Sequence, residues 1–237
     1  MLFSSIFNYY MGTELERLYY DDRKQKINLI FSIIINLAVL VFFKYYGFLL
    51  NTIGGIIGIH IPHPELSLPI GLSFYTFRNL SYLFDIYLSK VSAQRNFLTF
   101  AVYSTMFPYT SAGPIVRYTD IETQLKQRTI NISKFGTGAE LFVKGLAKKV
   151  LLADNLSVLY SSICGHPQMS VFTSWLGILA YTMQLYFDFS GYSLMAIGLG
   201  RMLGFYFPQN FNYPYISKSI TEFWRRWHIT LSSWFRD

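Results

Sequence analysis

The sequence has little charge for its length and almost no cysteine. Asp, Glu, Lys and Arg make up only 14% of the 237 residues, whereas a soluble domain carries about 25%. Cys164 is the single cysteine, which excludes a disulfide within the chain. Residues 1–11 have neither a basic stretch nor a small-residue cleavage site, so they do not have the layout of a signal peptide.

Several common functional motifs are missing as well. The chain has no glycine loop of the Walker type, no dinucleotide fingerprint, and no paired Cys or His residues at metal-ligand spacing. It shows no internal repeat of 20–50 residues, which argues against a solenoid and an inverted-repeat transporter. Its basic residues are not interleaved with a nucleic-acid motif, so we expect neither a metal, nor a permanently bound cofactor, nor nucleic acid.

What the sequence has in abundance is apolar and aromatic residues. Hydrophobic residues make up 52% of the chain and aromatic residues 19%, and aromatic side chains are enriched where helices meet lipid–water interfaces. The alternative is a soluble helical domain with a Phe-rich core, but the long apolar runs would leave such a domain with a greasy surface. We therefore expect an all-α, polytopic transmembrane protein with re-entrant and amphipathic interfacial helices.

The apolar runs predict the membrane segments. Residues 27–50 form the clearest span, because a helix needs about 20 apolar residues to cross the hydrocarbon. Residues 14–26 are predicted to be a solvated loop, and residues 1–11 resemble the tail of a helix. The other predicted segments are a span over 68–88, a re-entrant or kinked segment over 97–115 broken by Pro108 and Pro114, a tilted or amphipathic helix over 135–163, one long kinked helix or two joined pieces over 171–203, and an amphipathic helix over 216–235.

Positive charge is unevenly distributed between these segments. The net charge is +7, and the basic residues crowd into four stretches, 17–26, 90–95, 117–134 and 201–226. The stretches 51–66 and 164–170 have no Lys or Arg. By the positive-inside rule the basic group faces the cytoplasm, where anionic lipids favour it. The predicted protein crosses its membrane several times.

Three charged residues lie within apolar runs. Arg78 and Asp85 are seven residues apart and share a helical face, and Asp188 lies in the middle of the 171–203 run. Charges at that depth should face the protein interior or water. The structural alternative is an ion pair or a helix-packing contact.

His228 is the histidine whose surroundings predict chemistry. It lies beside an apolar stripe of the 216–235 helix, and burial there would keep its imidazole neutral. A neutral imidazole removes protons from hydroxyls near pH 7. Two alternatives stay open, a packed helical histidine and a triad with Ser232 and Asp188, which has no nucleophile elbow to support it. The other histidines are predicted to be solvated in loops: His60, His63 and His166.

Three stretches carry a resemblance to a known family. They are FNYPYISKSITEFWRRWHITLSSWFRD at 211–237 within a longer match over 184–237, SFYTFRNLSYLFDIY at 73–87 and FPYTSAGPIVRY at 107–118. Together they resemble the membrane-bound O-acyltransferases, nearest to the alginate O-acetyltransferase branch, with the teichoic-acid D-alanyl transfer proteins as cousins. The resemblance covers almost the whole chain in order.

The resemblance implies a function and a site. It implies transfer of an acetyl or other acyl group to hydroxyls of an exported polysaccharide, with His228 as general base in a tunnel through the membrane. It implies an acyl donor on the cytoplasmic side, acetyl-CoA or an acyl carrier, and periplasmic or extracellular acetyltransferase partner proteins. The neighbouring residues expected to bind substrate are Asp188, Trp224, Arg225 and Trp227.

The chain also departs from the pattern of this family. Leu194 stands where related sequences often have an acid. Family members continue past WFRD to a second histidine in a Leu-Trp-His-Gly setting and begin with more membrane helices, so residues 1–237 are expected to be one partial membrane domain. The competing functions are a non-catalytic membrane export or scaffold component, which would line a water path with Arg78, Asp85 and Asp188, and an inactive truncated remnant.

Overall fold

The computed structural model describes residues 1–62, 64, 66–110, 112–166 and 169–236, and in these ranges the regular structure is helical throughout. The predicted all-α class is therefore confirmed. The chain forms two compact units. Unit 1 comprises Met1–Ser111 and Arg117–Thr119, and unit 2 comprises Ala112–Val116 and Asp120–Asp237.

Unit 1 is built from four α-helices and one short 3₁₀ turn. Asp21 caps the second helix by accepting from the Lys24 N–H, and Gly58 ends it in a left-handed conformation. The predicted loop over 14–26 was too long, because helical backbone occupies all but the short turn between the first two helices. The elements are α1 (Leu2–Arg17), α2 (Asp22–Ile57), α3 (Leu72–Tyr87), α4 (Phe97–Thr105) and η1 (Phe107–Tyr109).

Helix α2 has the properties of a membrane span. Within the described ranges it is the one helix whose length and apolar composition suit a crossing, and only 17% of its most apolar stretch is buried. The predicted span over 27–50 falls inside it. The break predicted in the 97–115 segment is also confirmed, because α4 ends at Thr105 and only the three-residue turn η1, with Pro108, follows.

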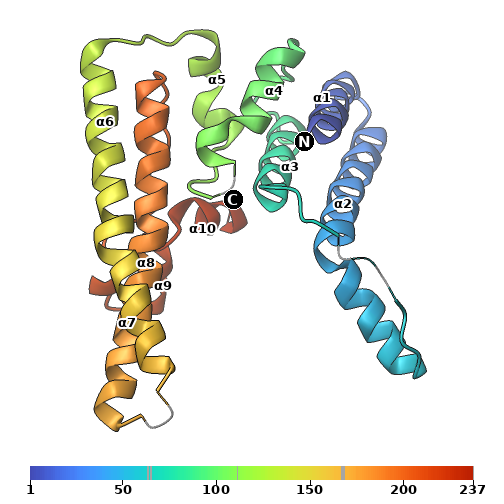
Figure 1. Cartoon of the computed structure of the whole chain (residues 1–237). Coiled ribbons are helices and arrows are strands. Elements are labelled where there is room, and N and C mark those ends of the chain that lie inside the picture. Colours follow the sequence, from blue (N-terminus) through green and yellow to red (C-terminus); the bar gives the residue numbers. More distant parts are fainter. Residues whose placement is uncertain (63, 65, 111, 167–168, 237) are drawn as a thin grey trace. The chain divides into compact units, whose positions relative to one another are not determined.

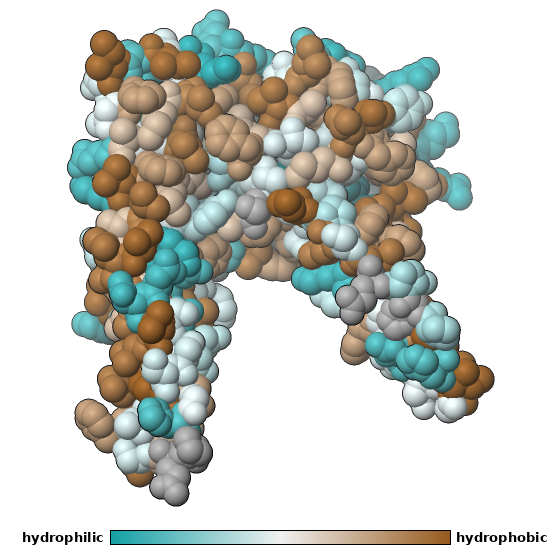
Figure 2. Space-filling view, in the orientation of Figure 1, coloured by the Kyte–Doolittle hydropathy of each residue, from teal (hydrophilic) through white to brown (hydrophobic). Residues whose placement is uncertain are grey.

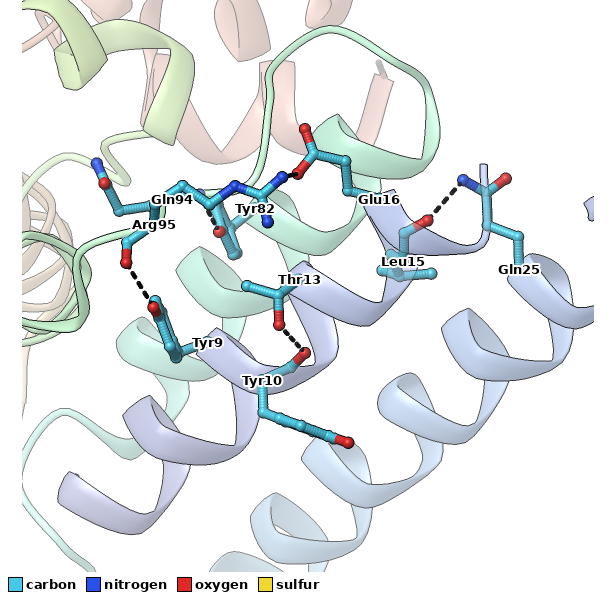
Figure 3. A network of polar contacts seen from close by, with 9 residues as sticks. All are labelled: Tyr9, Tyr10, Thr13, Leu15, Glu16, Gln25, Tyr82, Gln94 and Arg95. Atoms are coloured by element: carbon cyan, nitrogen blue, oxygen red, sulfur yellow. Dashed lines mark hydrogen bonds and ion pairs between the residues drawn. The ribbon is translucent and has the colours of Figure 1, made fainter. Parts of the chain in front are cut away.

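Buried polar pairs tie the helices of unit 1 together. Asn8 on α1 and Asn36 on α2 bond each other reciprocally, amide nitrogen to amide oxygen, at 3.0 and 2.8 Å. Small polar contacts of this kind join apolar helices that have little else to hold them in lipid. Nearer the α1–α2 turn, Gln25 donates to the Leu15 carbonyl, and Arg95 pairs with Glu16 at 2.6 Å (Figure 3).

Arg78 is the most deeply buried charged residue of unit 1, with 1% of its surface exposed. Its guanidinium donates to the carbonyls of Tyr109 and Ser104 at 2.8 and 2.9 Å and lies over the Tyr109 ring. Asp85 faces Lys90 at 4.0 Å instead of Arg78. These contacts support the structural alternative for Arg78, a packing contact that clamps α3 to the chain around η1.

Unit 2 is organised around two long helical segments and two short terminal helices. Helix α8 runs unbroken through Gly191, so the 171–203 run forms one helix and not two pieces. The 135–163 segment passes from α6 through a six-residue π-helix into α7. The elements are α5 (Tyr118–Lys126), α6 (Ile132–Ala147), η2 (Lys148–Ala153), α7 (Asp154–Cys164), α8 (Val171–Met202), η3 (Pro214–Ile216), α9 (Ile220–Arg226) and α10 (Ile229–Arg236).

Helices α6 and α8 lie side by side (Figure 1) and approach each other through glycine. A Cβ on Gly145 would lie 2.6 Å from the Gly191 carbonyl oxygen, and a Cβ on Gly138 would lie 2.7 Å from that of Gly198. The two backbones are therefore too close for any side chain at these positions, as in membrane helix pairs that use small residues.

The outward faces of α6, η2, α7 and α8 carry exposed apolar side chains. Figure 2 shows brown, apolar groups along this part of the molecule. More than half of the surface is exposed for Val143, Leu151, Val158, Trp175 and Leu179. Large apolar residues exposed in such number are typical of a surface that faces lipid.

Candidate functional site

His228 lies at a sharp break between two short helices of unit 2. Helix α9 ends at Arg226 and α10 begins at Ile229, and His228 itself has a left-handed backbone with φ of 43°. The predicted continuous helix over 216–235 was therefore wrong. A side chain in this conformation costs about 1–2 kcal/mol, and such strain is concentrated at functional sites.

The break directs the imidazole of His228 toward two uncharged groups. Its Nδ1 lies 3.0 Å from Oδ1 of Asn210, which belongs to the loop after α8. Its ring meets the edge of Phe189 of α8, with centroids 4.8 Å apart. Within the described part of the chain Nε2 has no hydrogen-bond partner, so one ring nitrogen is held and the other is left for a substrate.

Burial determines the charge of this ring. It lowers the pKa of His228 from 6.5 to about 4, because the charged form loses hydration and no carboxylate compensates. The imidazole is therefore neutral at physiological pH. The sequence-based prediction of a neutral His228 agrees with this environment, and His228 lies outside the helices long enough to cross a membrane.

Asn210 connects His228 to three other segments of unit 2. Its Oδ1 also accepts from the Thr230 hydroxyl and main-chain N–H, at 2.9 and 3.3 Å. Its Nδ2 donates to Ser193 of α8 at 3.1 Å, and Thr230 in turn accepts from the Ile115 N–H at 2.9 Å. The Asn210 side chain is 1% exposed as a residue, so this network is dry. The sequence analysis did not single out Asn210, Ser193 or Thr230.

The first N–H groups of α10 are already used. The Ile229 N–H donates to the Asn210 carbonyl at 2.9 Å, and the Thr230 N–H donates to the Asn210 side chain. Helix N-termini often stabilise developing negative charge. Because Asn210 occupies these two N–H groups, neither is available to stabilise negative charge on a bound molecule.

Trp227 is the predicted substrate-binding residue with the most contacts. It stacks on Phe223 with centroids 5.7 Å apart and meets Phe211 edge-on at 5.1 Å. Tyr215 is part of the same aromatic group. These contacts fix the chain immediately before His228, so Trp227 supports the site by packing.

The other three predicted substrate-binding residues are more exposed. Trp224 and Arg225 of α9 are exposed, and Trp224 packs edge-on against Phe223. Asp188 of α8 is half-exposed and forms an ion pair with Lys149 at 2.7 Å, and Lys149 also pairs with Asp154. These two ion pairs connect η2 to α7 and to α8. The substrate roles of Asp188, Trp224 and Arg225 stay predictions.

A cavity of about 130 Å³ lies beside Asn210. We call it the α8 cavity, and it shares Asn210 and Ser193 with the hydrogen-bond network of His228. Ser190 contributes a buried hydroxyl that has no hydrogen-bond partner among the described residues. The described lining of the α8 cavity contains no Asp or Glu. Residues that line it include Lys148, Ser190, Ser193, Leu194, Gln209 and Asn210.

The remaining histidines do not join this site. His60 and His166 are exposed, as predicted, and His63 lies outside the described residues. In the described ranges no three His, Cys, Asp or Glu side chains gather closely enough to hold a metal ion. The absence of a metal or a permanent cofactor stays a prediction.

Comparison with known proteins matches the membrane-bound O-acyltransferase family to residues 3–237. The probable alginate O-acetylase AlgI of Pseudomonas aeruginosa is 45% identical over 98% of this chain and 46% of its own length. The peptidoglycan O-acetyltransferase of Helicobacter pylori is 33% identical over 99% of this chain and 50% of its own, and the teichoic acid D-alanyltransferase of Bacillus subtilis is 30% identical over 75% and 46%. The chain thus spans about half the length of these curated relatives.

Proposed function

Because this chain belongs to the membrane-bound O-acyltransferase family, we propose that it transfers an acetyl or other acyl group to hydroxyls of an exported polysaccharide, with His228 as the general base. The observation that carries the proposal is the geometry of that ring, held through Nδ1 by Asn210 with Nε2 uncommitted. The similarity to an alginate O-acetylase favours acetyl as the group and a uronate polymer as the acceptor.

The residues support a simple proton path. Nε2 of His228 removes the proton from an acceptor hydroxyl, and the oxygen attacks the carbonyl carbon of the acyl donor. The tetrahedral intermediate collapses as the bond to the donor sulfur breaks, and the imidazolium returns its proton to that leaving thiolate. The low pKa of His228 suits this role, because the base is unprotonated before the hydroxyl arrives.

We place the acyl donor, acetyl-CoA or an acyl carrier, on the cytoplasmic side and the polysaccharide on the opposite side. The protein is a membrane protein, and we propose that it is a multi-pass protein of the bacterial inner membrane. Helix α4 and the turn η1 form the proposed re-entrant segment, and the short helices α9 and α10 lie at the interface. Periplasmic or extracellular acetyltransferase proteins are the proposed partners.

The alternative of a non-catalytic export or scaffold component depends on a water path lined by charges. Arg78 is committed to two carbonyls and a ring, and Asp188 to Lys149. Both side chains are thus engaged by other parts of the protein, which favours a structural role over lining such a path. An inactive remnant would have no reason to keep a strained histidine with a bonded amide partner.

The proposal is tested by His228→Ala in the intact protein in its native membrane. We expect acetyl transfer to the polysaccharide to fall by about 10²–10⁴-fold, the usual contribution of a general base, while membrane insertion is unchanged. The exposed His166 provides the matched control, because His166→Ala makes the same change without touching the network. Acetylation at the control level in His228→Ala would overturn the base role.

A further inference from the structure

The hydrogen-bond network around Asn210 fixes which of its two amide ends faces His228. A main-chain N–H can only donate, and the Thr230 N–H lies 3.3 Å from the atom assigned as Oδ1. The Thr230 hydroxyl accepts from the Ile115 N–H, so its own proton is available for the same oxygen at 2.9 Å. The main-chain N–H requires an acceptor and the hydroxyl is able to donate to the same atom, so the oxygen of Asn210 and not its nitrogen lies on this side.

This orientation in turn fixes the proton on the imidazole. The oxygen of Asn210 cannot donate, so the 3.0 Å contact with Nδ1 exists only when Nδ1 carries the hydrogen. A neutral imidazole with a proton on Nδ1 has its lone pair on Nε2. The tautomer with its proton on Nε2 would place the lone pair of Nδ1 against the amide oxygen of Asn210. Two acceptors in contact repel each other.

We propose that Asn210 is a positioning residue that holds His228 in the Nδ1-protonated tautomer, so that Nε2 is the basic atom. This inference rests on the proposed function, because it assigns the atom that would act as base. The opposite end of the amide is anchored to Ser193 of α8 at 3.1 Å. The ring orientation is therefore set by the longest helix of unit 2 and not by the short helices α9 and α10 alone.

The choice of an amide instead of a carboxylate has a consequence for charge. The two groups that contact the ring are uncharged, namely the Asn210 amide on one side and Phe189 of α8 on the other. An amide fixes the tautomer as a carboxylate does, but it adds no negative charge to stabilise the imidazolium. The ring is thus oriented and kept neutral at the same time.

Two substitutions of Asn210 separate its effect on the tautomer of His228 from its effect on the charge of the ring. Asn210→Leu keeps the approximate volume and removes the acceptor, so the lone pair is no longer confined to Nε2. Loss of the partner that orients a functional imidazole costs about 10–100-fold in metal sites and about 10⁴-fold in a serine protease triad, so we expect kcat to fall at least about tenfold with little change in KM. Asn210→Asp retains the acceptor, since the Ser193 hydroxyl can turn to donate, and we expect activity to be retained.

The pH profile distinguishes positioning from simple support of the fold. A carboxylate beside the imidazole raises its pKa, by about 1–3 units for close opposite charges. The acid limb of kcat/KM should therefore move to higher pH in Asn210→Asp by at least about one unit. Asn212→Leu is the matched control, because Asn212 is exposed and lies two residues away; its activity and pH profile should stay within about twofold of the parent.

A readout independent of turnover completes the test. In detergent-solubilised protein labelled with ¹⁵N-histidine, the His228 signals are identified by their loss in His228→Ala, and we expect Nδ1 to be the protonated nitrogen in the parent and a mixture of tautomers in Asn210→Leu. An unprotonated Nδ1 in the parent, or an Asn210→Leu variant as active as Asn212→Leu, would overturn the positioning role. Because the tautomer is measured without substrate, this result stands apart from the outcome of the His228→Ala activity test.

Discussion

Both units of the chain bury asparagine side chains, and the two units use them in different ways. In unit 1, Asn8 and Asn36 bond each other, so that donor and acceptor are both consumed within the pair. In unit 2, Asn210 gives its oxygen to His228 and Thr230 and its nitrogen to Ser193. The first arrangement is closed and joins two helices. The second ends in an imidazole with an uncommitted nitrogen, which is what chemistry requires.

The same contrast holds for the buried cation of unit 1. Arg78 uses two nitrogens for main-chain carbonyls and lays its plane over Tyr109. These backbone contacts stabilise the fold by joining α3 to the chain around η1, while among the described residues the buried Nε of Arg78 has no hydrogen-bond partner. From this comparison we propose structural support for the polar interior of unit 1 and chemistry for that of unit 2, and the division is open to test by perturbing each unit separately.

The largest effect is expected from the helix contact that supports the site. Gly145→Leu places a side chain where even a Cβ would lie 2.6 Å from the Gly191 carbonyl oxygen. Overpacking of this kind costs about 3 kcal/mol or more, so we expect a strongly lowered Tm and loss of acyl transfer, because α8 carries Phe189 and Ser193. Gly136→Leu on the same helix meets nothing within 4 Å and should be neutral. Equal Tm values for the two variants, measured by circular dichroism in detergent, would contradict this close contact.

A smaller effect is expected from breaking the hydrogen bonds of Arg78 that join α3 to the chain around η1 in unit 1. Arg78→Met leaves the carbonyls of Tyr109 and Ser104 without their donor, at about 1–3 kcal/mol for each unsatisfied group. The Tm should fall, whereas the pH dependence of any remaining activity should be unchanged, because the substitution does not touch the His228 network. Arg17→Met is the control, with a side chain that is 79% exposed. A shifted pH profile in Arg78→Met would show that the division between the two units is wrong.

The smallest effect concerns the parent protein between pH 7 and pH 5.5. With a pKa of about 4, His228 stays unprotonated over this range, so kcat/KM should change by less than about twofold. An ordinary histidine with a pKa of 6.5 would be only about a tenth neutral at pH 5.5. The unfolded chain binds this proton and the folded chain does not, so stability falls as the pH drops from 6.5 toward 4. Half-maximal activity near pH 6.5 would show that His228 is better hydrated than its burial indicates.

The sequence predicted the helical class and most segments, because apolar runs and prolines act locally. The span over 27–50 and the break at Pro108 follow directly from composition. The continuous helix through His228 was predicted wrongly, because the apolar stripe has helical spacing on both sides of the break. Only the tertiary contacts of His228 with Asn210 and Phe189 explain why the chain adopts a left-handed residue there.

Asn210 escaped prediction for a related reason. It lies 18 residues before His228 in a loop between Pro208 and Pro214, and loop asparagines usually serve their own turns. Its function depends on three partners, namely Ser193 of α8, Thr230 of α10 and His228 at the break between α9 and α10. The same holds for Lys148 and Ser190 in the α8 cavity, whose proximity depends on how η2 packs against α8. The signal was a group of amides, Gln209, Asn210 and Asn212, among apolar residues, which is a reason to look for a buried partner.

The paired glycines of α6 and α8 limit how this protein is able to move. Gly138 faces Gly198 and Gly145 faces Gly191, so the contacts recur every seven residues on both antiparallel helices. Sliding α8 along α6 in either direction would bring the bulk of a neighbouring residue such as Tyr192 or Met195 against the opposing backbone. We therefore expect that α8 does not slide along its own axis relative to α6. The backbone that carries Phe189 and Ser193 is therefore expected to keep its position along α6.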